Sequence, residues 1–373
     1  MTAMTPVRYH GLDALRGFAM LLGIVLHGAL PYMGLPNEVW PSDKGTSPIT
    51  NILFEFIHIW RMPVFFVLAG FFASLLIDRY SWSYWWDNRM KRILLPVIIF
   101  TPIMALTVPW IWVYGLYGKL WFFYTMEGYP WHLWFLGHLL LFAFFSFIFV
   151  SLGEILRNKG LGIAVNYIGY LNIFAWVTKY KIFQSRYPVM LTLLIFLAGW
   201  PTAAELTGNP IIGALYFSFG YGLYKKTSLL NFMNHHWIKY MVASTFFFLL
   251  YLLIYKNFDA FDPKTWETWY IPYLGLKSIN GVLFSYALIG LAEEKFGEYS
   301  RSLRFISDSS YWIYLIHFPV VTLITFSMFN VTLFPELKFI IAIIATSVIG
   351  LVSYKYMVRS TLIGVLLNGK KLP

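Results

Sequence analysis

The feature that most constrains this sequence is a succession of long apolar stretches separated by short polar segments. A helix needs about 20 residues to cross the hydrocarbon core of a bilayer. Stretches close to this length occupy 12–33, 52–77, 93–113, 132–152, 188–206, 208–224, 237–256, 271–291, 309–330 and 338–358. Only 12% of the 373 residues are charged, which is roughly half the share found in soluble chains. The sequence therefore predicts an all-α, polytopic membrane bundle of about ten helices in one domain, residues 1–373.

A further candidate stretch lies at 161–178, flanked by Lys159, Lys179 and Lys181. Lysines at both ends favour a helix in the headgroup region over an eleventh crossing. An eleventh crossing would also break the alternation of positive and neutral loops. The N-terminus lacks a small-residue cleavage site after an apolar stretch, so we expect no cleaved signal peptide.

Lysine and arginine are distributed unevenly between alternate loops, and cytoplasmic loops of membrane proteins are the ones enriched in them. With the N-terminus inside, cytoplasmic segments contain most of the basic residues between 79 and 92, 157 and 186, 225 and 226, 295 and 304, and 359 and 371. The opposite side contains Lys44, Lys119, Lys256, Lys264 and Lys338, with Arg61 and Lys277 near helix ends. Both termini are predicted to be cytoplasmic, in the inner membrane of a bacterium. The net charge of +11 then reflects topology and indicates no nucleic-acid partner.

Several classes of active site are excluded by the residues. The chain contains no cysteine, so disulfides, thiolate nucleophiles and cysteine-ligated metals are ruled out. It has no GxSxG elbow, HExxH motif or phosphate-binding loop. Histidine and carboxylate residues do not follow the spacing of a metal site, so we expect no metal.

The first apolar stretch carries ionisable residues that are costly to bury in a membrane, namely Asp13, Arg16 and His27. Arg16 and His27 are eleven positions apart, about three helical turns or 16 Å, so they project from nearly the same face. Met20 and Gly23 lie between them on that face. One interpretation is that Arg16 reaches lipid phosphates and His27 only satisfies a neighbour. Because ionisable residues inside membranes are usually functional, we favour a polar track facing the bundle interior.

The second stretch adds Glu55, His58 and Arg61, spaced by three residues near its predicted outer end. Neighbouring members of such a series can touch on one helix face, and all three should lie at a depth similar to that of His27. The alternative is that Glu55 and Arg61 merely neutralise each other at the headgroups.

A basic cluster at the start of the third stretch contains Arg89, Lys91 and Arg92. Forked guanidinium groups bind phosphate well, although anchoring to anionic lipid explains the same residues. Later stretches add His132 and His138, and then His317 directly before Phe318 and Pro319. A single buried histidine is more often a hydrogen-bonded core residue than a catalyst. These patterns fit group transfer from a phosphate-bearing donor inside to an acceptor outside, and they fit a transporter equally well.

Several motifs, in order, resemble those of the membrane acyltransferase-3 family over nearly the whole chain. LDALRGFAMLLGIVLH (12–27) resembles its opening segment and contains the Arg16–His27 pair. FFVLAGFF (65–72) differs from the family by Ala69 in place of the usual serine. RMKRILLP (89–96), HLWFL (132–136) and SYWIYLIHFPV (310–320) resemble three further motifs. Within the family, the segments FIHIWRMPVFFVLAGFF (56–72) and SYWWDNRMKR (83–92) are most similar to enzymes that succinylate osmoregulated periplasmic glucans.

The resemblance implies transfer of an acyl group, succinyl by preference, from cytoplasmic acyl-CoA as co-substrate to hydroxyls of a periplasmic glucan. Arg16, Arg89 and Arg92, with Lys91 beside them, would hold the CoA phosphates. His27 would be the general base, with His58 as a second candidate, and Glu55 would orient its ring. Arg61 would stabilise the oxyanion or bind the carboxylate of a succinyl group.

Three further residues are candidates for acceptor binding or for a structural role: His132, Trp134 and His317. The aromatic segment 124–134 would supply ring faces for sugar, and anchoring in the interface explains its Trp and Tyr residues equally well. O-acetyl transfer to another surface glycan such as lipopolysaccharide is the alternative enzyme, and a glycan transporter or flippase is the non-enzymatic alternative. The oligomeric state stays open, and a homodimer is compatible with the sequence.

Overall fold

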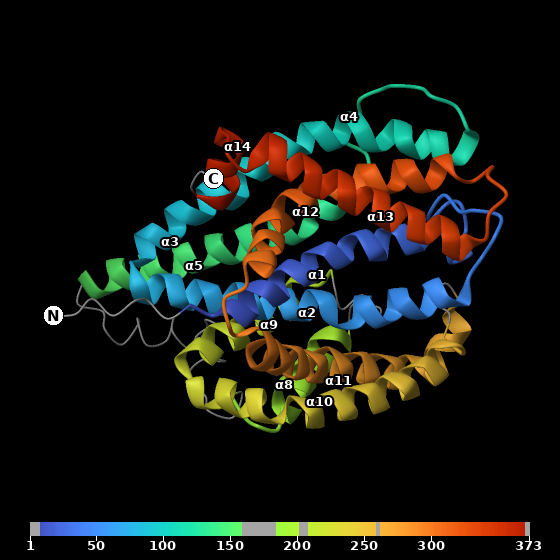
Figure 1. Ribbon diagram of the computed structural model, residues 1–373. Coiled ribbons are helices and arrows are strands. Elements are labelled where there is room, and N and C mark those ends of the chain that lie inside the picture. Colours follow the sequence, from blue (N-terminus) through green and yellow to red (C-terminus); the bar gives the residue numbers. More distant parts are fainter. Residues whose placement is uncertain (1–7, 159–183, 201–207, 259–261, 370–373) are drawn as a thin grey trace.

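The computed structural model describes residues 8–158, 184–200, 208–258 and 262–369, and within them it contains helices and no strand (Figure 1). The predicted all-α fold is therefore confirmed. The predicted interfacial segment 161–178 lies outside the described residues.

The long helices follow one another in chain order. They are α1 (His10–Ala29), α2 (Pro48–Arg79), α3 (Trp82–Arg89), α4 (Leu95–Tyr117), α5 (Trp134–Asn158), α8 (Val189–Gly199), α9 (Pro210–Lys225), α10 (Thr227–Tyr255), α11 (Pro263–Phe296), α12 (Arg301–Ser327), α13 (Pro335–Ser353) and α14 (Leu362–Asn368). Within the described residues four short turns accompany them: the 3₁₀ turns η1 (Leu30–Tyr32) and η3 (Trp131–Leu133), and the π-helical turns η2 (Met90–Leu94) and η5 (Tyr354–Val358).

Each of the ten predicted stretches falls on a helix. Within the described residues, eight helical segments are long and apolar enough to cross a membrane, and one of them joins α3, η2 and α4. The other two predicted stretches correspond to α8 and α9, which are shorter, at 11 and 16 residues. The protein is thus a multi-pass helical membrane bundle in which α8 and α9 are the two shortest candidates for a crossing.

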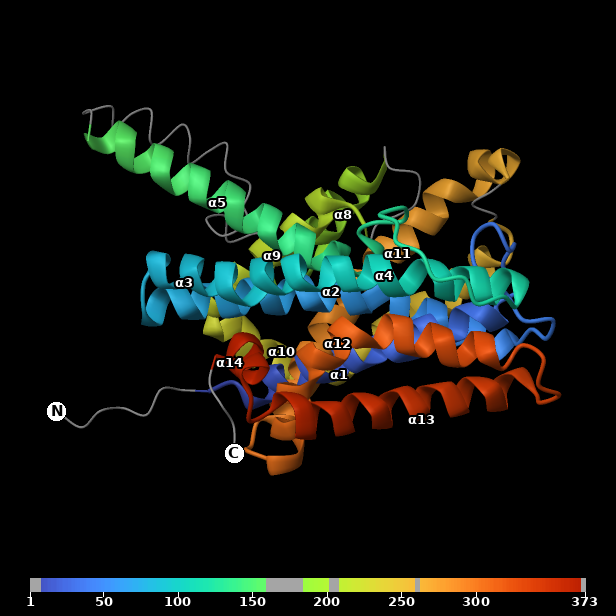
Figure 2. The same ribbon diagram turned by 90° about the horizontal axis from the view of Figure 1, so that it is seen from above.

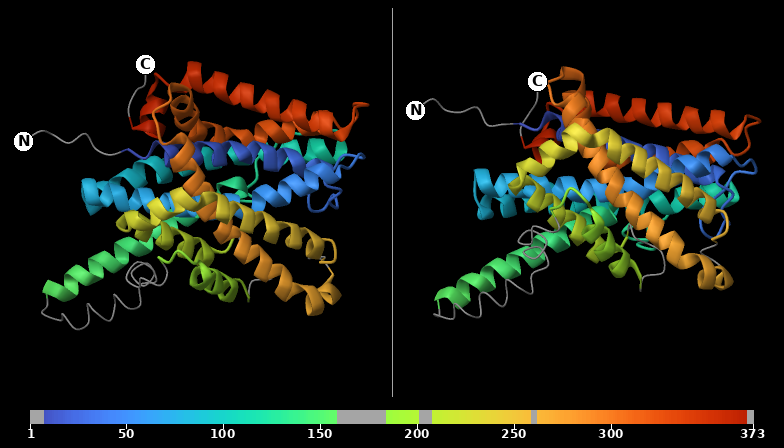
Figure 3. Two further views of the ribbon diagram at one scale, coloured as in Figure 1. Left: turned by 60° about the horizontal axis from the view of Figure 1, so that its bottom comes forward. Right: turned by 90° about the horizontal axis from the view of Figure 1, so that it is seen from below.

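Helices α1 and α2 run through the middle of the molecule (Figure 1). On one side α1 packs along α12, which in turn contacts α4 and α13; on the other side α2 packs along α9. Helices α10 and α11 form a long pair on the face opposite α13 (Figures 1 and 3). This arrangement surrounds α1 and α2, the two helices with the most candidate site residues.

The α2–α9 crossing is close because two glycines meet there. A Cβ atom at Gly70 would collide with the Phe217 carbonyl, and one at Gly220 would collide with the Val67 carbonyl. Small residues allow helix backbones to approach in membranes, where packing rather than burial from water drives association. Gly70 and Gly220 therefore allow the backbones of α2 and α9 to pack closely.

Helix α5 leaves the bundle at an angle and extends beyond its neighbours (Figure 2). Its apolar side chains are correspondingly exposed, among them Phe144, Phe145 and Phe147. In a membrane protein such a face contacts lipid tails.

The two ends of the bundle differ in the charged residues that they carry. We call the end with Arg16, Arg89 and Arg92 the arginine end, and the opposite end, with His27 and the loop 33–47, the cleft end. The turn η2 and the last helix, α14, meet at the arginine end, because Arg92 Nη2 donates a hydrogen bond to the Asn368 carbonyl at 2.7 Å. Which end faces the cytoplasm stays a prediction from the charge distribution.

Candidate active site

An open cleft of about 660 Å³ lies at the cleft end of the bundle. Its walls come from the loop 33–47, from α4, from the segment after α4 and from α12. The lining residues are His27, Glu38, Val39, Trp40, Val108, Pro109, Trp112, Val113, Leu116, Phe123, Thr125, Glu127, Gly128, Trp131, His132, Trp134 and Phe318. A volume of this size is within the range of small-molecule binding sites.

Three predicted site residues, His27, His132 and Trp134, line the cleft, and the two histidines lie next to Phe318. The rings of both lie with centroids 5.0 Å from that of Phe318. Behind them, the His317 ring is 5.4 Å from His27 and 5.2 Å from His132. Three histidines from α1, η3 and α12 are therefore brought together, although they are nearly 300 residues apart in sequence. Within the described residues they are not arranged to hold a metal ion.

The tautomers of His132 and His317 follow from a carbonyl that they share. His132 Nε2 lies 3.0 Å and His317 Nδ1 lies 2.7 Å from the Tyr314 carbonyl oxygen. A carbonyl only accepts, so both nitrogens must carry the proton. In the neutral rings, His132 Nδ1 and His317 Nε2 are then free acceptors, and both are buried without a partner.

The shared carbonyl lies in a turn of α12 that Pro319 interrupts. Proline has no backbone N–H and cannot bond the carbonyl four residues earlier, that of Leu315. His132 is within hydrogen-bonding reach of the Leu315 carbonyl as well. The Tyr314 hydroxyl donates back to the His132 carbonyl at 2.7 Å, which fixes η3 against α12.

Arg61 reaches this histidine group through the space that Gly23 leaves on α1. A Cβ atom at Gly23 would lie 2.8 Å from Arg61 Nη1 and 2.9 Å from His317 Nε2. Arg61 Nε is buried without a hydrogen-bond partner. The structure thus brings together His27 from the first helix and Arg61 from the second, as the sequence predicted.

Glu55 does not orient His27, contrary to expectation. Its carboxylate accepts a 2.5 Å hydrogen bond from the Tyr251 hydroxyl and another from Tyr255. Residues six apart on a helix differ by roughly 240° around the axis, so Glu55 faces α10 and α11 while Arg61 faces α1. The unpartnered atom of His27 is Nδ1, which no carboxylate approaches in the described part of the chain.

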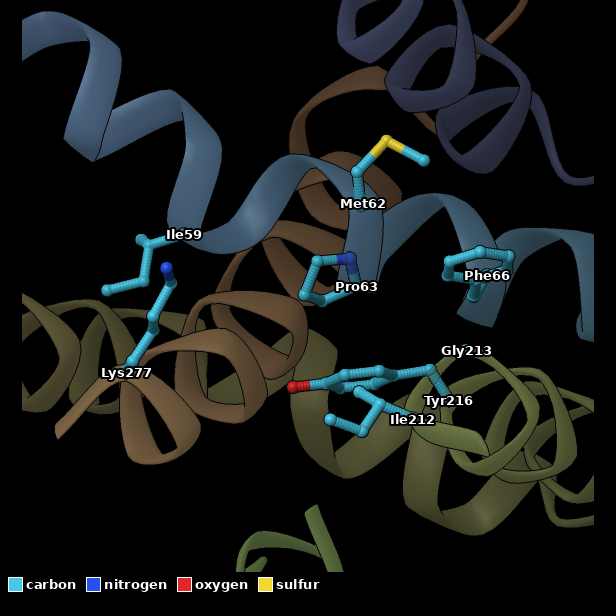
Figure 4. Close-up of a pocket in the computed structure, with 8 residues that line it drawn as sticks. All are labelled: Ile59, Met62, Pro63, Phe66, Ile212, Gly213, Tyr216 and Lys277. Carbon is cyan, nitrogen blue, oxygen red and sulfur yellow. The ribbon is translucent and has the colours of Figure 1, made fainter. Parts of the chain in front are cut away.

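Glu55 instead belongs to a second polar group with Tyr251, Tyr273 and Lys277. Lys277 Nζ donates to the Tyr273 hydroxyl at 3.1 Å, and Tyr251 lies 3.5 Å from the same hydroxyl. Figure 4 shows Lys277 extending from α11 toward α2 beside Ile59, at a pocket of about 10 Å³. That volume holds about one water molecule, so this pocket is too small for a sugar ring.

His58 lies between the two polar groups. Its ring stacks on Phe54 with a centroid distance of 5.0 Å, and it is within electrostatic reach of both Lys277 and Arg61. It is not one of the residues that line the cleft. The geometry therefore gives His27 the more direct access to a molecule in the cleft.

At the arginine end, Arg16, Arg89 and Arg92 lie within electrostatic reach of one another. Arg16 pairs with Asp13 at 3.1 Å and shares that carboxylate with Arg8 and Arg304, so positive charge remains in excess there. Within the described residues, Arg89 and Arg92 pair with no carboxylate; Arg89 Nη2 donates to Asn88 and its guanidinium lies over Trp85. Arg89 Nε is buried without a partner. An anion is the ligand that this group fits.

The local backbone explains how Arg92 joins the group. It lies in the π-helical turn η2, a wider turn of a kind often found at functional sites. The Tyr311 hydroxyl donates to the Arg92 carbonyl at 2.7 Å and so links η2 to α12.

Lys91 does not belong to this group, which corrects the sequence prediction. Its Nζ pairs with Asp87 at 2.8 Å, and both side chains are exposed. Lys91 and Asp87 are four residues apart and share the outer face of the helix, whereas Arg89 and Arg92 face inward.

The sequence did not identify Trp40, Trp112 or Tyr314 as site residues. Trp40 and Trp112 pack edge to face at 4.6 Å, and Trp40 stacks beside His27 at 6.2 Å. Nothing in the sequence singles out Trp40, which lies in a loop between helices. Tyr314 offered a signal, since it lies three residues before His317 in a motif already noted.

Comparison with known proteins settles the family. The family model described as an acyltransferase domain, acyltransferase-3, matches residues 9–355. The chain belongs to the acyltransferase-3 family. It is thus a membrane acyltransferase, and the resemblance seen in the sequence is confirmed.

Among curated relatives, glucans biosynthesis protein C of Escherichia coli K12 is 37% identical over 107 residues, or 28% of this chain. Glucans biosynthesis protein C of Salmonella paratyphi B is 36% identical over the same length. The matched region spans 27% of the length of each relative. No solved structure matches the chain.

Proposed function

We propose that this acyltransferase moves an acyl group, specifically succinyl, from acyl-CoA bound at the arginine end to a hydroxyl of a periplasmic glucan bound in the cleft. The arginine end would face the cytoplasm, in a bacterial inner membrane. The observation that carries the proposal is the placement of His27, at the cleft, on the same helix face as Arg16. A glucan acceptor is supported by the names of the relatives.

The donor would bind through its phosphates to Arg89 and Arg92, which lack carboxylate partners in the described structure. Arg16 would add charge beside them. The helix between Arg16 and His27 is about 16 Å long, a distance that the pantetheine arm of CoA can cover. The thioester would then reach the histidine group without a carrier.

The transfer step needs a base and a stabiliser of negative charge. As the glucan hydroxyl oxygen bonds to the thioester carbonyl carbon, His27 takes the hydroxyl proton. Arg61 is close enough to His27 and His317 to stabilise the oxyanion that forms. The oxyanion collapses, the carbon–sulfur bond breaks, and the CoA thiolate leaves and takes up a proton. The products are a succinyl ester of the glucan and free CoA.

The test uses purified protein in proteoliposomes, supplied with labelled succinyl-CoA on the side of the arginine end and a neutral β-glucan on the other. We expect mass spectrometry to detect succinylated glucan, and we expect His27→Gln to abolish it. Labelled acetyl-CoA in a parallel reaction distinguishes the two acyl groups. Movement of unmodified glucan without ester formation would instead show a transporter and refute the proposal.

A further inference from the structure

The cleft is acidic although the chain as a whole is strongly basic. Glu38 and Glu127 line it, and none of the described lining residues is lysine or arginine. The net charge of the chain is +11. In the part of the chain that the structure describes, neither glutamate forms an ion pair. Both are exposed carboxylate side chains and face whatever enters the cleft.

The remaining lining suits a saccharide without charge. Trp40, Trp112, Trp131 and Trp134 present aromatic surface, on which the C–H faces of sugar rings pack. His132 is 5% exposed, and its Nδ1 is an acceptor without a partner, ready for a hydroxyl donor. The Trp40 indole N–H is likewise unpartnered and matches a hydroxyl acceptor. The cleft thus offers hydrogen bonds and ring faces, and no group that would neutralise an anion.

The loop that supplies Glu38 and Trp40 is anchored to neighbouring elements. Lys338 on α13 pairs with Asp43 at 2.7 Å, with both side chains buried. Backbone N–H groups of Asp43 and Ser47 donate to the carbonyls of Pro31 and Tyr32. Glu38 is therefore carried by a segment that is anchored to the η1 turn and to α13.

We infer that the cleft selects uncharged saccharide and that Glu38 and Glu127 repel anionic acceptors. This inference rests on the proposed function, since it names the class of acceptor. It has a consequence for the product: every succinyl ester carries a free carboxylate, so each transfer adds a negative charge to the glucan. The two glutamates would repel that charge, which favours release of product and disfavours a second transfer beside the first. An anionic surface polysaccharide would be rejected for the same reason.

The test measures binding by isothermal titration calorimetry without any acyl donor. The two probes are a neutral β-glucan oligosaccharide and the same oligosaccharide carrying one succinyl half-ester. We expect the neutral probe to bind more tightly, by roughly two- to fivefold for each carboxylate that repels the charge, as for exposed charge pairs. The difference should shrink as salt is raised from 20 mM to about 0.5 M, since salt screens exposed charges.

The variant Glu38→Gln/Glu127→Gln should bind the two probes equally. Glu267→Gln is the matched control, because Glu267 is an exposed carboxylate early in α11 that does not line the cleft. It should keep the parental preference. Equal binding of both probes by the parent protein, tighter binding of the charged probe, or no saccharide binding at all would each overturn the inference.

A separate assay of transfer keeps the two proposals apart. A parental preference for the neutral probe without any acyl transfer would refute the proposed function and leave the charge selection standing. Acyl transfer together with equal binding of both probes would support the proposed function and refute the charge selection. In the double variant, transfer should yield more glucans with two or more succinyl groups per chain, measured by mass spectrometry.

Discussion

Replacing Gly23 by alanine tests whether the histidine–arginine group is the catalytic centre. The new methyl group would lie 2.8 Å from Arg61 Nη1 and 2.9 Å from His317 Nε2. A relaxed contact is roughly 3.5 Å, so these side chains must move by about 0.6 to 0.7 Å. His317 is held by its bond to Tyr314, and most of the shift should therefore fall on Arg61.

The substitution should reduce activity without unfolding the protein. Alanine is about 0.8–1.0 kcal/mol more favourable than glycine inside a helix, and the colliding atoms are ends of side chains. A misplacement of about 1 Å at a reacting centre can cost roughly a hundredfold in rate. We expect kcat for acyl transfer to fall between about tenfold and a hundredfold, with KM for acyl-CoA nearly unchanged because the arginine end is untouched.

Gly28→Ala is the matched control on the same helix. Its methyl group would meet Val321 Cγ2 at 3.4 Å and Phe339 at 3.7 Å, which are ordinary contacts. It should retain parental activity. The assay is initial-rate succinylation in detergent or nanodiscs, with thermal unfolding of each variant measured alongside. Equal activity of the Gly23 and Gly28 variants would show that Arg61 and His317 do not act in the reaction.

Three further predictions concern other parts of the molecule. Arg92→Ala should raise KM for acyl-CoA about tenfold, because it removes a charge-assisted contact of roughly 1.5–3 kcal/mol. Lys91→Ala should change KM little. Equal effects of the two substitutions on initial rates would contradict the assignment of the donor site. Lys338→Met should lower the free energy of unfolding by about 3–5 kcal/mol by leaving Asp43 buried and unpaired, and an unchanged melting temperature in detergent would show that the pair is dispensable. His27→Gln should lower kcat by roughly 10²–10⁴-fold while CoA binding, measured by calorimetry, stays parental; activity within a few-fold of the parent would make another residue the base.

The helices, and the spacing of residues along one helix, could be predicted from the sequence. Which neighbouring helix each face of a helix contacts could not. The apolar stretches gave the helical bundle, and the spacing of Arg16 and His27 placed them on one face. Glu55 and Arg61 looked equally available to His27, because the sequence does not say which neighbour each face of α2 meets. The packing of α2 between α1 and the α10–α11 pair turns Arg61 toward α1 and Glu55 toward α10 and α11.

The cleft was harder to predict because segments without periodicity form much of it. Glu38 and Trp40 come from the loop after η1, and Glu127 from the segment before η3. Their position depends on distant anchors such as the Asp43–Lys338 pair, which joins residues 295 positions apart. The prediction for Lys91 was wrong because clustering in the sequence does not distinguish the inward face of the helix from the outward face.

The two ends of α1 differ in charge in a way that gives the proposed reaction a direction. At the arginine end, Arg89 and Arg92 have no carboxylate partner in the described structure, an arrangement that attracts a phosphate-bearing donor. At the cleft end, Glu38 and Glu127 form no ion pair within the described residues and would repel anions. A donor bearing several negative charges would therefore bind at the arginine end and be repelled at the cleft end. An uncharged saccharide would not be affected by these charges and would bind through ring faces and hydrogen bonds. In the proposed reaction only the acyl thioester on its flexible arm would need to travel along α1 to His27, so the charge asymmetry would help to hold donor and acceptor at opposite ends of the bundle during transfer.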